Sequence, residues 1–266
     1  MESNSPAQRR GVLKTITAKA AKDVGRAYSR YYSLLADVFA QELLAVSPRV
    51  VLEAGCGKGQ LTFPLLSMLP KHTRLIAVDS SRGPYRGWLE ELAARVRGSS
   101  LARRVQVVRS DAGRLTGVKD ESVDAIVSNE LLCDLPRKQQ LEKVLGEFQR
   151  VLRPGGRMVH GEWVSWAENG TQSFVMRHWP TWTPDQLFSL MKREGFYDFH
   201  VSYFDTTISF GYEPGLEELR SWGAPDSLLK RYDKLVRLHG LQLPFEHIIT
   251  CRKAARRVGH KRVRND

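Results

Sequence analysis

The sequence predicts an α/β fold built on a doubly wound, mostly parallel sheet of seven strands. Short apolar runs alternate with amphipathic segments from residue 27 onward, and a glycine-rich turn directly follows the first of these runs. Strands separated by helix-length segments need crossover connections, which set the strands parallel and place helices on both faces. A chain of 266 residues is long enough for one such domain.

The elements can be read in order from these patterns. Apolar and aromatic residues recur at three- and four-residue steps over 27–46, which predicts an amphipathic helix that caps the domain. The segments that follow are predicted as a strand (50–54), a helix (61–69), a strand (74–79), a helix (85–97), strands (105–108 and 123–129), a helix (138–152) and a strand (157–162).

The last third of the chain has a different pattern of predicted helices and strands. We expect a helix over 183–194, an extended run over 199–210 and a last strand over 245–251. A polar, helical insertion over 213–239 separates the extended run from the last strand, where it can cover the strand ends. The domain is therefore expected to span 27–251.

The amino-acid composition excludes several classes of protein. Hydrophobic residues make up 42% of the chain and charged residues 26%, as in ordinary globular proteins. No apolar run reaches the roughly 18 residues of a membrane span, and no secretory signal segment is present. Cys56, Cys133 and Cys251 are too scattered for a disulfide framework or a cysteine zinc site. We expect a cytoplasmic protein without a metal site or a membrane partner.

The formal net charge of +12 is concentrated at the two ends. Residues 1–26 carry six basic and two acidic residues, and residues 252–266 carry seven basic residues and one acidic residue. Such a flexible basic arm and tail can dock on RNA or an acidic protein, or can simply be solvated ends that aid solubility. Neither end has the interleaved aromatic residues that base stacking requires.

The glycine-rich turn from Glu53 to Gly59 is the first candidate ligand site. Its three glycines stand at alternate positions after a buried strand, as needed where the backbone takes positive φ and a ligand approaches closely. The third glycine comes too early for the G-x-G-x-x-G pattern of a dinucleotide site. The turn thus predicts a ligand other than a dinucleotide.

This turn resembles the E/D-x-G-x-G-x-G signature of class I S-adenosylmethionine-dependent methyltransferases. The resemblance implies that the loop with Gly55, Cys56, Gly57 and Gly59 passes beneath the methionine part of the cofactor. Glu53 would help to orient the amino end of that methionine part.

Later strand ends continue the same resemblance. It implies that Asp79, with Ser80, binds the ribose hydroxyls, and that Asp111 and Ala112 lie beside the adenine amino group. Asn129 takes the position whose backbone faces the sulfonium. The run 152–156 matches the L-[KR]-P-G-G turn of the family. The expected cofactor is S-adenosylmethionine.

Catalysis by methyl transfer requires alignment for an in-line displacement and, for some acceptors, a base. The run 129–136 lacks the Asn/Asp-Pro-Pro-Tyr/Phe motif of enzymes that methylate adenine or glutamine amino groups. Cys133 lacks the setting of the cytosine-C5 enzymes and is expected to be a buried thiol. Glu130 and Asp134 either bind a cationic group or act as base, or else favour the start of the next helix through its dipole.

Aromatic residues and histidines supply the remaining candidates. Trp163 begins a tryptophan-rich stretch that either surrounds a flat or cationic acceptor or belongs to the core. His160 is a candidate general base, and His178 a candidate base or acceptor contact. Tyr28 and Tyr32 lie in the expected cap helix, where one of them can contact the cofactor or the acceptor.

The first functional expectation is methyl transfer to a small molecule. The second keeps this chemistry but makes RNA or a protein the acceptor, docked by the basic ends. The third is a non-catalytic module with the same fold. Intact Gly55, Gly57, Gly59, Asp79 and Asp111 speak against the third, because a module without cofactor has no physical need of them.

Overall fold

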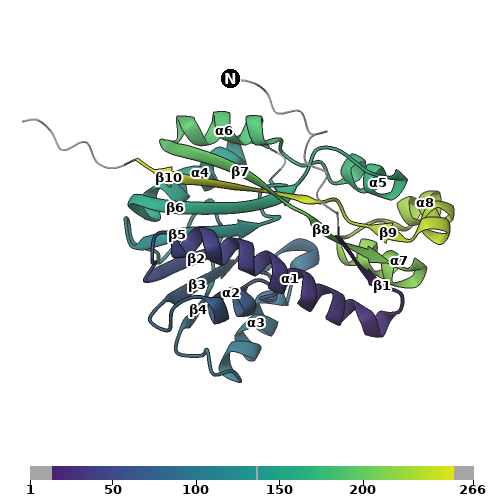
Figure 1. Cartoon of the computed structure of the whole chain (residues 1–266), viewed down its shortest axis with the longest axis horizontal. Coiled ribbons are helices and arrows are strands. Elements are labelled where there is room, and N and C mark those ends of the chain that lie inside the picture. Colours follow the sequence, from purple (N-terminus) through teal and green to yellow (C-terminus); the bar gives the residue numbers. More distant parts are fainter. Residues whose placement is uncertain (1–13, 136, 255–266) are drawn as a thin grey trace, which may run out of the picture.

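The computed structural model describes residues 14–135 and 137–254, and its centre is a seven-stranded sheet (Figure 1). The strands lie in the order β4-β3-β2-β5-β6-β10-β7. β10 runs antiparallel between β6 and β7, and the other pairs are parallel. Their bounds are β2 (Val50–Ala54), β3 (Arg74–Asp79), β4 (Val105–Arg109), β5 (Val123–Asn129), β6 (Leu152–Trp163), β7 (Phe196–Phe204) and β10 (Glu246–Lys253).

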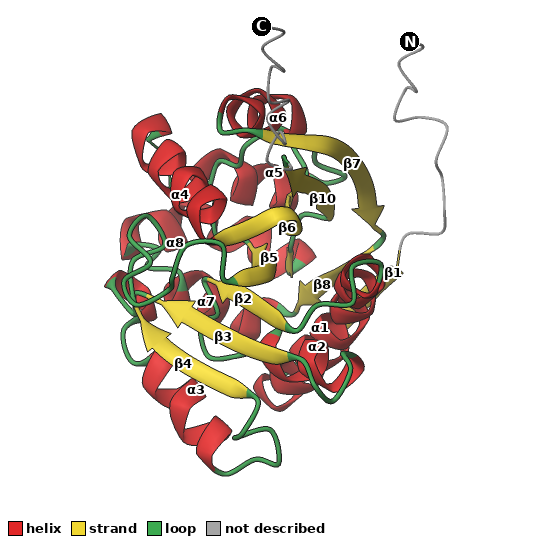
Figure 2. Ribbon diagram, turned by 90° about the vertical axis from the view of Figure 1, so that its left-hand side faces the viewer, coloured by secondary structure: helices red, strands yellow, loops and turns green. Residues whose placement is uncertain are grey.

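Helices pack on both faces of this sheet (Figure 2). One face, called the α1 face below, carries α1 (Ala21–Leu44), α2 (Thr62–Met68) and α3 (Trp88–Arg97). The other, called the α4 face, carries α4 (Lys138–Val151) and α6 (Pro184–Arg193). Successive strand residues alternate between the two faces, so each face has its own apolar core. The predicted doubly wound architecture is confirmed.

A second, three-stranded sheet lies beside the first. It consists of β1 (Lys14–Ala18), β8 (Thr206–Phe210) and β9 (Leu241–Gln242), with β8 in the middle. The predicted extended run is thus two strands, one in each sheet. Figure 1 shows α5 (Gly170–His178), α7 (Tyr212–Ser221) and α8 (Asp226–His239) gathered at the same end of the molecule as this sheet.

The helical insertion is present as α7 and α8, whereas α5 was not anticipated. Asn169 caps α5, because its side-chain oxygen accepts hydrogen bonds from the backbone amides of Thr171 and Gln172. Within the described ranges, no helix combines the length and the apolar character needed to cross a bilayer.

The expected boundaries at the two ends need correction. The cap helix begins at Ala21 rather than at residue 27, and β1 precedes it because β8 offers a parallel edge with which residues 14–18 pair. Residues 14–26 therefore belong to the fold rather than to a basic arm. At the other end, β10 runs on to Lys253, whose Nζ donates a hydrogen bond to the carbonyl of Leu152 (2.7 Å). The remaining parts of the predicted basic arm and tail, 1–13 and 255–266, lie outside the described residues.

The run 152–156 is an irregular start to β6 rather than a separate turn. Val123 pairs with Leu152, but Ala125 pairs with Arg157, so the intervening residues of β6 bulge away from β5. Gly155 takes a φ of 76°, which explains a glycine at this point.

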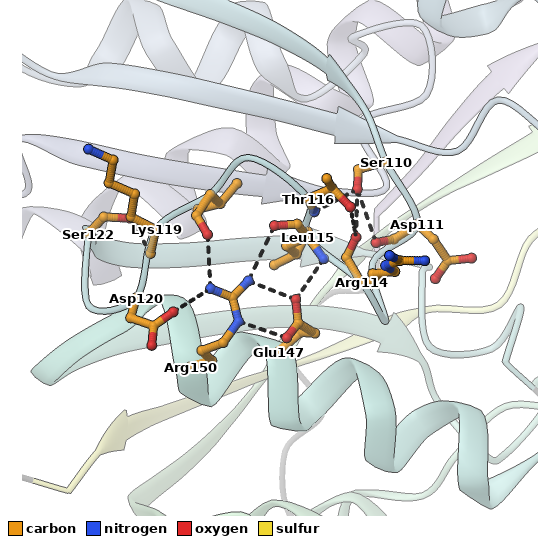
Figure 3. A network of polar contacts seen from close by, with 11 residues as sticks. Ser110, Asp111, Arg114, Leu115, Thr116, Lys119, Asp120, Ser122, Glu147 and Arg150 are labelled. Carbon is orange, nitrogen blue, oxygen red and sulfur yellow. Dashed lines mark hydrogen bonds and ion pairs between the residues drawn. The ribbon is translucent and has the colours of Figure 1, made fainter.

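Arg150 of α4 anchors the loop between β4 and β5, as Figure 3 shows. Its guanidinium donates to the carbonyl oxygens of Leu115 (3.2 Å) and Val118 (2.9 Å), to Asp120 (2.6 Å) and, through two nitrogens, to Glu147 (2.8 Å each). Glu147 in turn accepts from the amide of Leu115 (2.7 Å). The loop that begins with Asp111 is therefore attached to α4.

Replacing Arg150 by methionine should lower the free energy of unfolding by about 1–3 kcal/mol, because it leaves loop carbonyls and the Glu147 carboxylate without their donor. Hydrogen bonds from Arg150 hold the pKa of Glu147 below its usual range. Their stabilisation is present above the ordinary glutamate pKa and is lost as the pH falls through the lowered value. Urea unfolding at neutral and acidic pH measures both effects. The exposed Arg193→Met is the control, and equal losses in both variants would contradict the assignment.

Candidate active site

The glycine-rich loop after β2 is held against β3 by one carboxylate. Asp79 accepts a hydrogen bond from the amide of Gly57 at Oδ2 (2.9 Å) and one from the amide of Ser81 at Oδ1 (2.6 Å). The amides of Gly55 and Cys56 both donate to the carbonyl of Val78. Each Asp79 oxygen keeps a second lone pair, so the carboxylate can still accept hydrogen bonds from a ligand.

The glycines of this loop satisfy a conformational and a steric need. Gly55, Gly57 and Gly59 have φ of 73°, 51° and 84°, in the left-handed region. A Cβ at Gly59 would lie 2.5 Å from Leu92 Cδ1, and one at Gly57 would lie 3.1 Å from the ring of Trp88. A side chain at these positions would therefore strain the backbone and displace its neighbours.

Glu53 lies at the start of this loop, buried on the α1 face next to Thr62. Its Oε2 has no hydrogen-bond partner among residues 14–135 and 137–254. Burial raises the pKa of this carboxyl to about 8, and the nearby negative charge of Asp79 adds to the rise. A bound ammonium group would supply the donor and the positive charge that this carboxyl lacks.

The remaining predicted cofactor residues lie along the adjacent strand ends. Asp111 follows β4 and is exposed; its Oδ1 accepts a hydrogen bond from the amide of Gly113 (2.8 Å), and its Oδ2 lies 3.6 Å from Arg82 Nη1. Ala112 is half-buried next to it, and Ser80 follows Asp79 on the neighbouring strand. The ends of β2, β3 and β4 thus form one continuous polar surface.

A second group of polar side chains lies beyond β5, on the α1 face. The hydroxyl of Tyr28 donates to Glu218 of α7, and that of Tyr31 donates to Glu246 of β10. Trp163 Nε1 donates to Glu130 Oε1 (2.6 Å). This group is called the glutamate cluster below and comprises Glu130, Glu218, Glu246, Tyr28, Tyr31, Tyr32 and Trp163.

The carboxyls of the glutamate cluster lie inside the fold, with Glu246 fully buried and Glu130 and Glu218 half-buried. Burial raises the pKa of Glu130 and of Glu246, and each also acts on the other. No ion pair within the described ranges includes either residue. The hydroxyl pKa values of Tyr28, Tyr31 and Tyr32 are raised as well, first by burial and then by these glutamates. Burial and mutual repulsion therefore favour the protonated forms of these carboxyls more than solvent would.

Asn129 connects the two groups. It ends β5, next to β2, and its Nδ2 lies 3.4 Å from Glu246 Oε1. Glu130 directly after it has a φ of 49°, a conformation that is uncommon outside glycine, and its amide donates to the carbonyl of Gly161 (2.9 Å). The strained backbone aims the Glu130 side chain at Trp163 instead of along the strand.

Residues 51–156 match the model of a family described as a methyltransferase domain. They span β2 to the irregular start of β6 and include the glycine-rich loop, Asp79, Asp111 and Asn129. Residues 51–156 are a class I, S-adenosylmethionine-dependent methyltransferase domain.

Individual relatives agree with this assignment. Over 176 residues the chain is 30% identical to the rat (Rattus norvegicus) thiol S-methyltransferase TMT1B, and the match covers 64% of each chain. The YcgJ protein of Bacillus subtilis has a similar fold, with a TM-score of 0.63, 14% identity, and coverage of 84% of this chain and 99% of that one. Phosphoethanolamine N-methyltransferase 2 of Haemonchus contortus, in complex with S-adenosyl-L-methionine, gives a TM-score of 0.53 at 17% identity, with 80% and 52% covered.

The cofactor of this methyltransferase domain is S-adenosylmethionine, and the residues present fit it. The glycine loop takes the left-handed conformations that only glycine adopts readily, Asp79 retains acceptor capacity, and Glu53 offers a buried oxygen without a donor. Cys56 contributes only its backbone to the loop, because its thiol is buried and burial raises its pKa.

The predicted catalytic residues are divided by the sheet. Glu130 lies in the glutamate cluster, but His160 is fully buried on the α4 face, with its Nδ1 2.9 Å from Ser128 Oγ and its Nε2 3.6 Å from Glu162. Asp134 lies near Tyr85 (3.4 Å), and burial raises its pKa to about 6. The structure thus brings Glu130 into the glutamate cluster, leaves Asp134 outside it and separates His160 from both.

The predicted acceptor residues are also divided. Tyr28, Tyr32 and Trp163 belong to the glutamate cluster, whereas His178 lies on α5 against Tyr232, with a centroid distance of 5.3 Å. His178 lines a groove of about 550 Å³ together with Trp179, Trp222, Gly223, Ala224, Pro225, Ser227, Leu228 and Arg231. Trp222 forms the inner wall of this groove, and its ring centroid lies 5.6 Å from that of Trp163.

Two central glutamates were missed by the sequence analysis. Glu246 stands at the start of an apolar strand, and the one acidic residue in 245–251 was a signal that the side chain has a special task. Glu218 carried no such signal, because it lies among several charged residues of an amphipathic helix. Only the packing of α7 against α1 brings it to the cluster.

Replacing Asp79 by asparagine should weaken binding of S-adenosylhomocysteine by about 1–3 kcal/mol, or roughly 5–150-fold. The amide keeps one acceptor oxygen but loses the charge and the second acceptor that hold the loop and the ribose. Calorimetric titration measures the change, with Asp37→Asn on the exposed side of α1 as the control. Unchanged affinity in a folded variant would show that the carboxylate does not hold the ribose.

Binding of S-adenosylhomocysteine at pH 7 should release a proton from Glu53. The free carboxyl, with a pKa of about 8, is mostly protonated at that pH, and an adjacent ammonium favours the charged form. Calorimetry in buffers of different ionisation enthalpy counts the proton. In Glu53→Gln the proton release should disappear, and its persistence would assign it to another group.

Proposed function

We propose that this protein transfers a methyl group from S-adenosylmethionine to a small-molecule acceptor. The observation that carries the proposal is the enclosure of the glutamate cluster. The Tyr28–Glu218 hydrogen bond joins α1 to α7 above it, and Tyr31, Trp163 and Glu246 are at most 5% exposed. Such an enclosed site is more accessible to a small molecule than to a folded protein or an RNA strand, and this supports a small-molecule acceptor.

The cofactor, when bound, supplies a methyl group on a positively charged sulfur. The chain's residues position and protect the reacting atoms. Glu53 and Asp79 bind the two ends of the cofactor, and Asn129 lies where the cofactor side meets the glutamate cluster. Helices α1 and α7 exclude water from the reacting centre, which strengthens the electrostatic interactions within it.

Glu130 is the proposed proton acceptor of the reaction. It is half-buried next to Glu246, and Trp163 holds one of its oxygens through a hydrogen bond. A positioned general base contributes about 10²–10⁴-fold to a rate.

Relatives support a small acceptor without naming it. The rat protein is a thiol S-methyltransferase and the Haemonchus contortus protein a phosphoethanolamine N-methyltransferase, and both of these acceptors are small molecules. This chain spans 64% of the rat relative, so its own acceptor is a separate question.

A labelling experiment tests the proposal directly. Full-length protein with methyl-labelled S-adenosylmethionine should transfer label to a pool of metabolites, and not to pools of RNA or protein. Label in RNA that declines as salt rises would instead favour docking through the basic ends, because phosphate contacts are salt-dependent. S-adenosylhomocysteine binding without transfer to any pool would favour a non-catalytic module.

Replacing Glu130 by glutamine should lower the transfer rate by about 10²–10⁴-fold and leave the affinity for S-adenosylhomocysteine within about twofold. The cofactor contacts of Glu53 and Asp79 are untouched by this change. Single-turnover transfer and calorimetry separate the two quantities. A rate that stays near wild type would remove Glu130 from the reaction.

A further inference from the structure

We propose that the acceptor is an amine, bound as a cation between the Glu130–Glu246 pair and the tyrosines of α1 and methylated on its nitrogen. This inference rests on the proposed function and names the substrate class of the same site. It depends on three features of the glutamate cluster: two unpaired oxygens, a set of aromatic rings, and a lack of positive charge.

Two buried oxygens meet over Gly161 with no donor between them. Glu246 Oε2 and Asn129 Oδ1 both lack a hydrogen-bond partner in the described part of the chain. A Cβ added at Gly161 would lie 2.8 Å from the first and 2.0 Å from the second. Buried acceptors without donors cost free energy, so the position favours a ligand that brings N–H groups.

Aromatic rings surround the same carboxyls. The ring centroid of Tyr32 lies 5.3 Å from that of Tyr31 and 6.0 Å from that of Tyr28. Trp163 reaches the cluster from β6 through its hydrogen bond to Glu130. Ring faces attract alkylated ammonium groups, and this attraction strengthens where water is excluded. Rings and carboxyls together fit a cation with an alkyl surface.

The negative charges of the cluster disfavour the binding of anionic acceptors. Thiols and phenols react as thiolates and phenolates, which carboxylates repel. Lys58 of the glycine-rich loop acts on Glu218, and no basic side chain pairs with Glu130 or Glu246 within 14–135 and 137–254. The Glu130–Glu246 pair thus offers no positive charge to stabilise an anion, whereas a cation would find two carboxyls.

The transfer step balances with these groups. The ammonium gives one proton to the carboxylate of the Glu130–Glu246 pair, which frees the nitrogen lone pair. That lone pair forms the new N–C bond with the methyl carbon as the S–C bond breaks, and the bonding electrons of the S–C bond stay on sulfur. The products are the methylated ammonium and S-adenosylhomocysteine, and the carboxyl later returns its proton to water.

The closing experiment compares a cation with its uncharged isostere. Wild-type protein saturated with S-adenosylhomocysteine is titrated with choline and, separately, with dimethylbutanol, in which carbon replaces the nitrogen. Tryptophan fluorescence reports binding through Trp163 and Trp222. Choline should bind at least about tenfold more tightly. Equal affinity for the two, or binding of neither, would overturn the inference without recourse to any variant.

Variants then place the cation. Glu246→Gln, which keeps the shape and removes the charge, should weaken choline binding by at least about tenfold and leave S-adenosylhomocysteine affinity unchanged. The matched control is Glu142→Gln, an exposed glutamate on α4 that should leave both affinities unchanged. Choline binding that survives in a folded Glu246→Gln protein would contradict the assignment.

The outcomes also separate this inference from the proposed function. Transfer of labelled methyl to dimethylethanolamine together with selective choline binding supports both. Transfer to thiols or phenols, with no preference for choline over its isostere, would overturn the amine assignment and leave small-molecule methyl transfer standing. Choline selectivity without methyl transfer to any pool would overturn the proposed function, and the amine acceptor with it.

Discussion

The carboxylate of Asp79 is the constraint on which the cofactor side of this protein depends. Three glycines in left-handed conformations lose much conformational entropy on folding, and a loop built from them needs an external anchor. Asp79 provides that anchor because parallel strands end at the same edge of the sheet, so the end of β3 meets the loop that leaves β2. The position of Glu53 at the start of the loop follows from the same attachment.

Because side chains alternate along a strand, the polar residues of β6 and β10 are distributed over both faces of the sheet. Along β6, His160 and Glu162 face α4, whereas Gly161 and Trp163 face α1. Glu162 has a supporting task on its own face, where its Oε2 accepts from the backbone amide of Cys133 (2.9 Å) and so steadies the segment that follows Glu130. His247 lies buried on that face as well, and burial lowers its pKa to about 4. Residues that are adjacent in the sequence of β6 thus lie on opposite faces of the sheet.

Sequence patterns predicted those elements whose structure depends on residues close together in the chain. The buried strands, the amphipathic helices and the glycine loop depend on residues close in the chain, and their type and order were right. The strand β1 was not predicted, because its pairing partner β8 lies about 190 residues away and its own sequence is short and partly polar. The face on which His160 lies was not predicted, because the glycine-rich bulge at the start of β6 hides which face its alternate residues take. Glu218 enters the site only through the packing of two helices.

Entry to the glutamate cluster requires the Tyr28–Glu218 hydrogen bond to break, since this bond joins the two helices above it. The partners are half-buried, so the closed arrangement is favoured over an opening that exposes more of the aromatic rings and the carboxyl to water. Opening must occur twice in each catalytic cycle, once for the acceptor and once for its methylated form. With the proposed activity, this motion of α1 against α7 is a candidate for the slow step, as lid opening is in many enzymes.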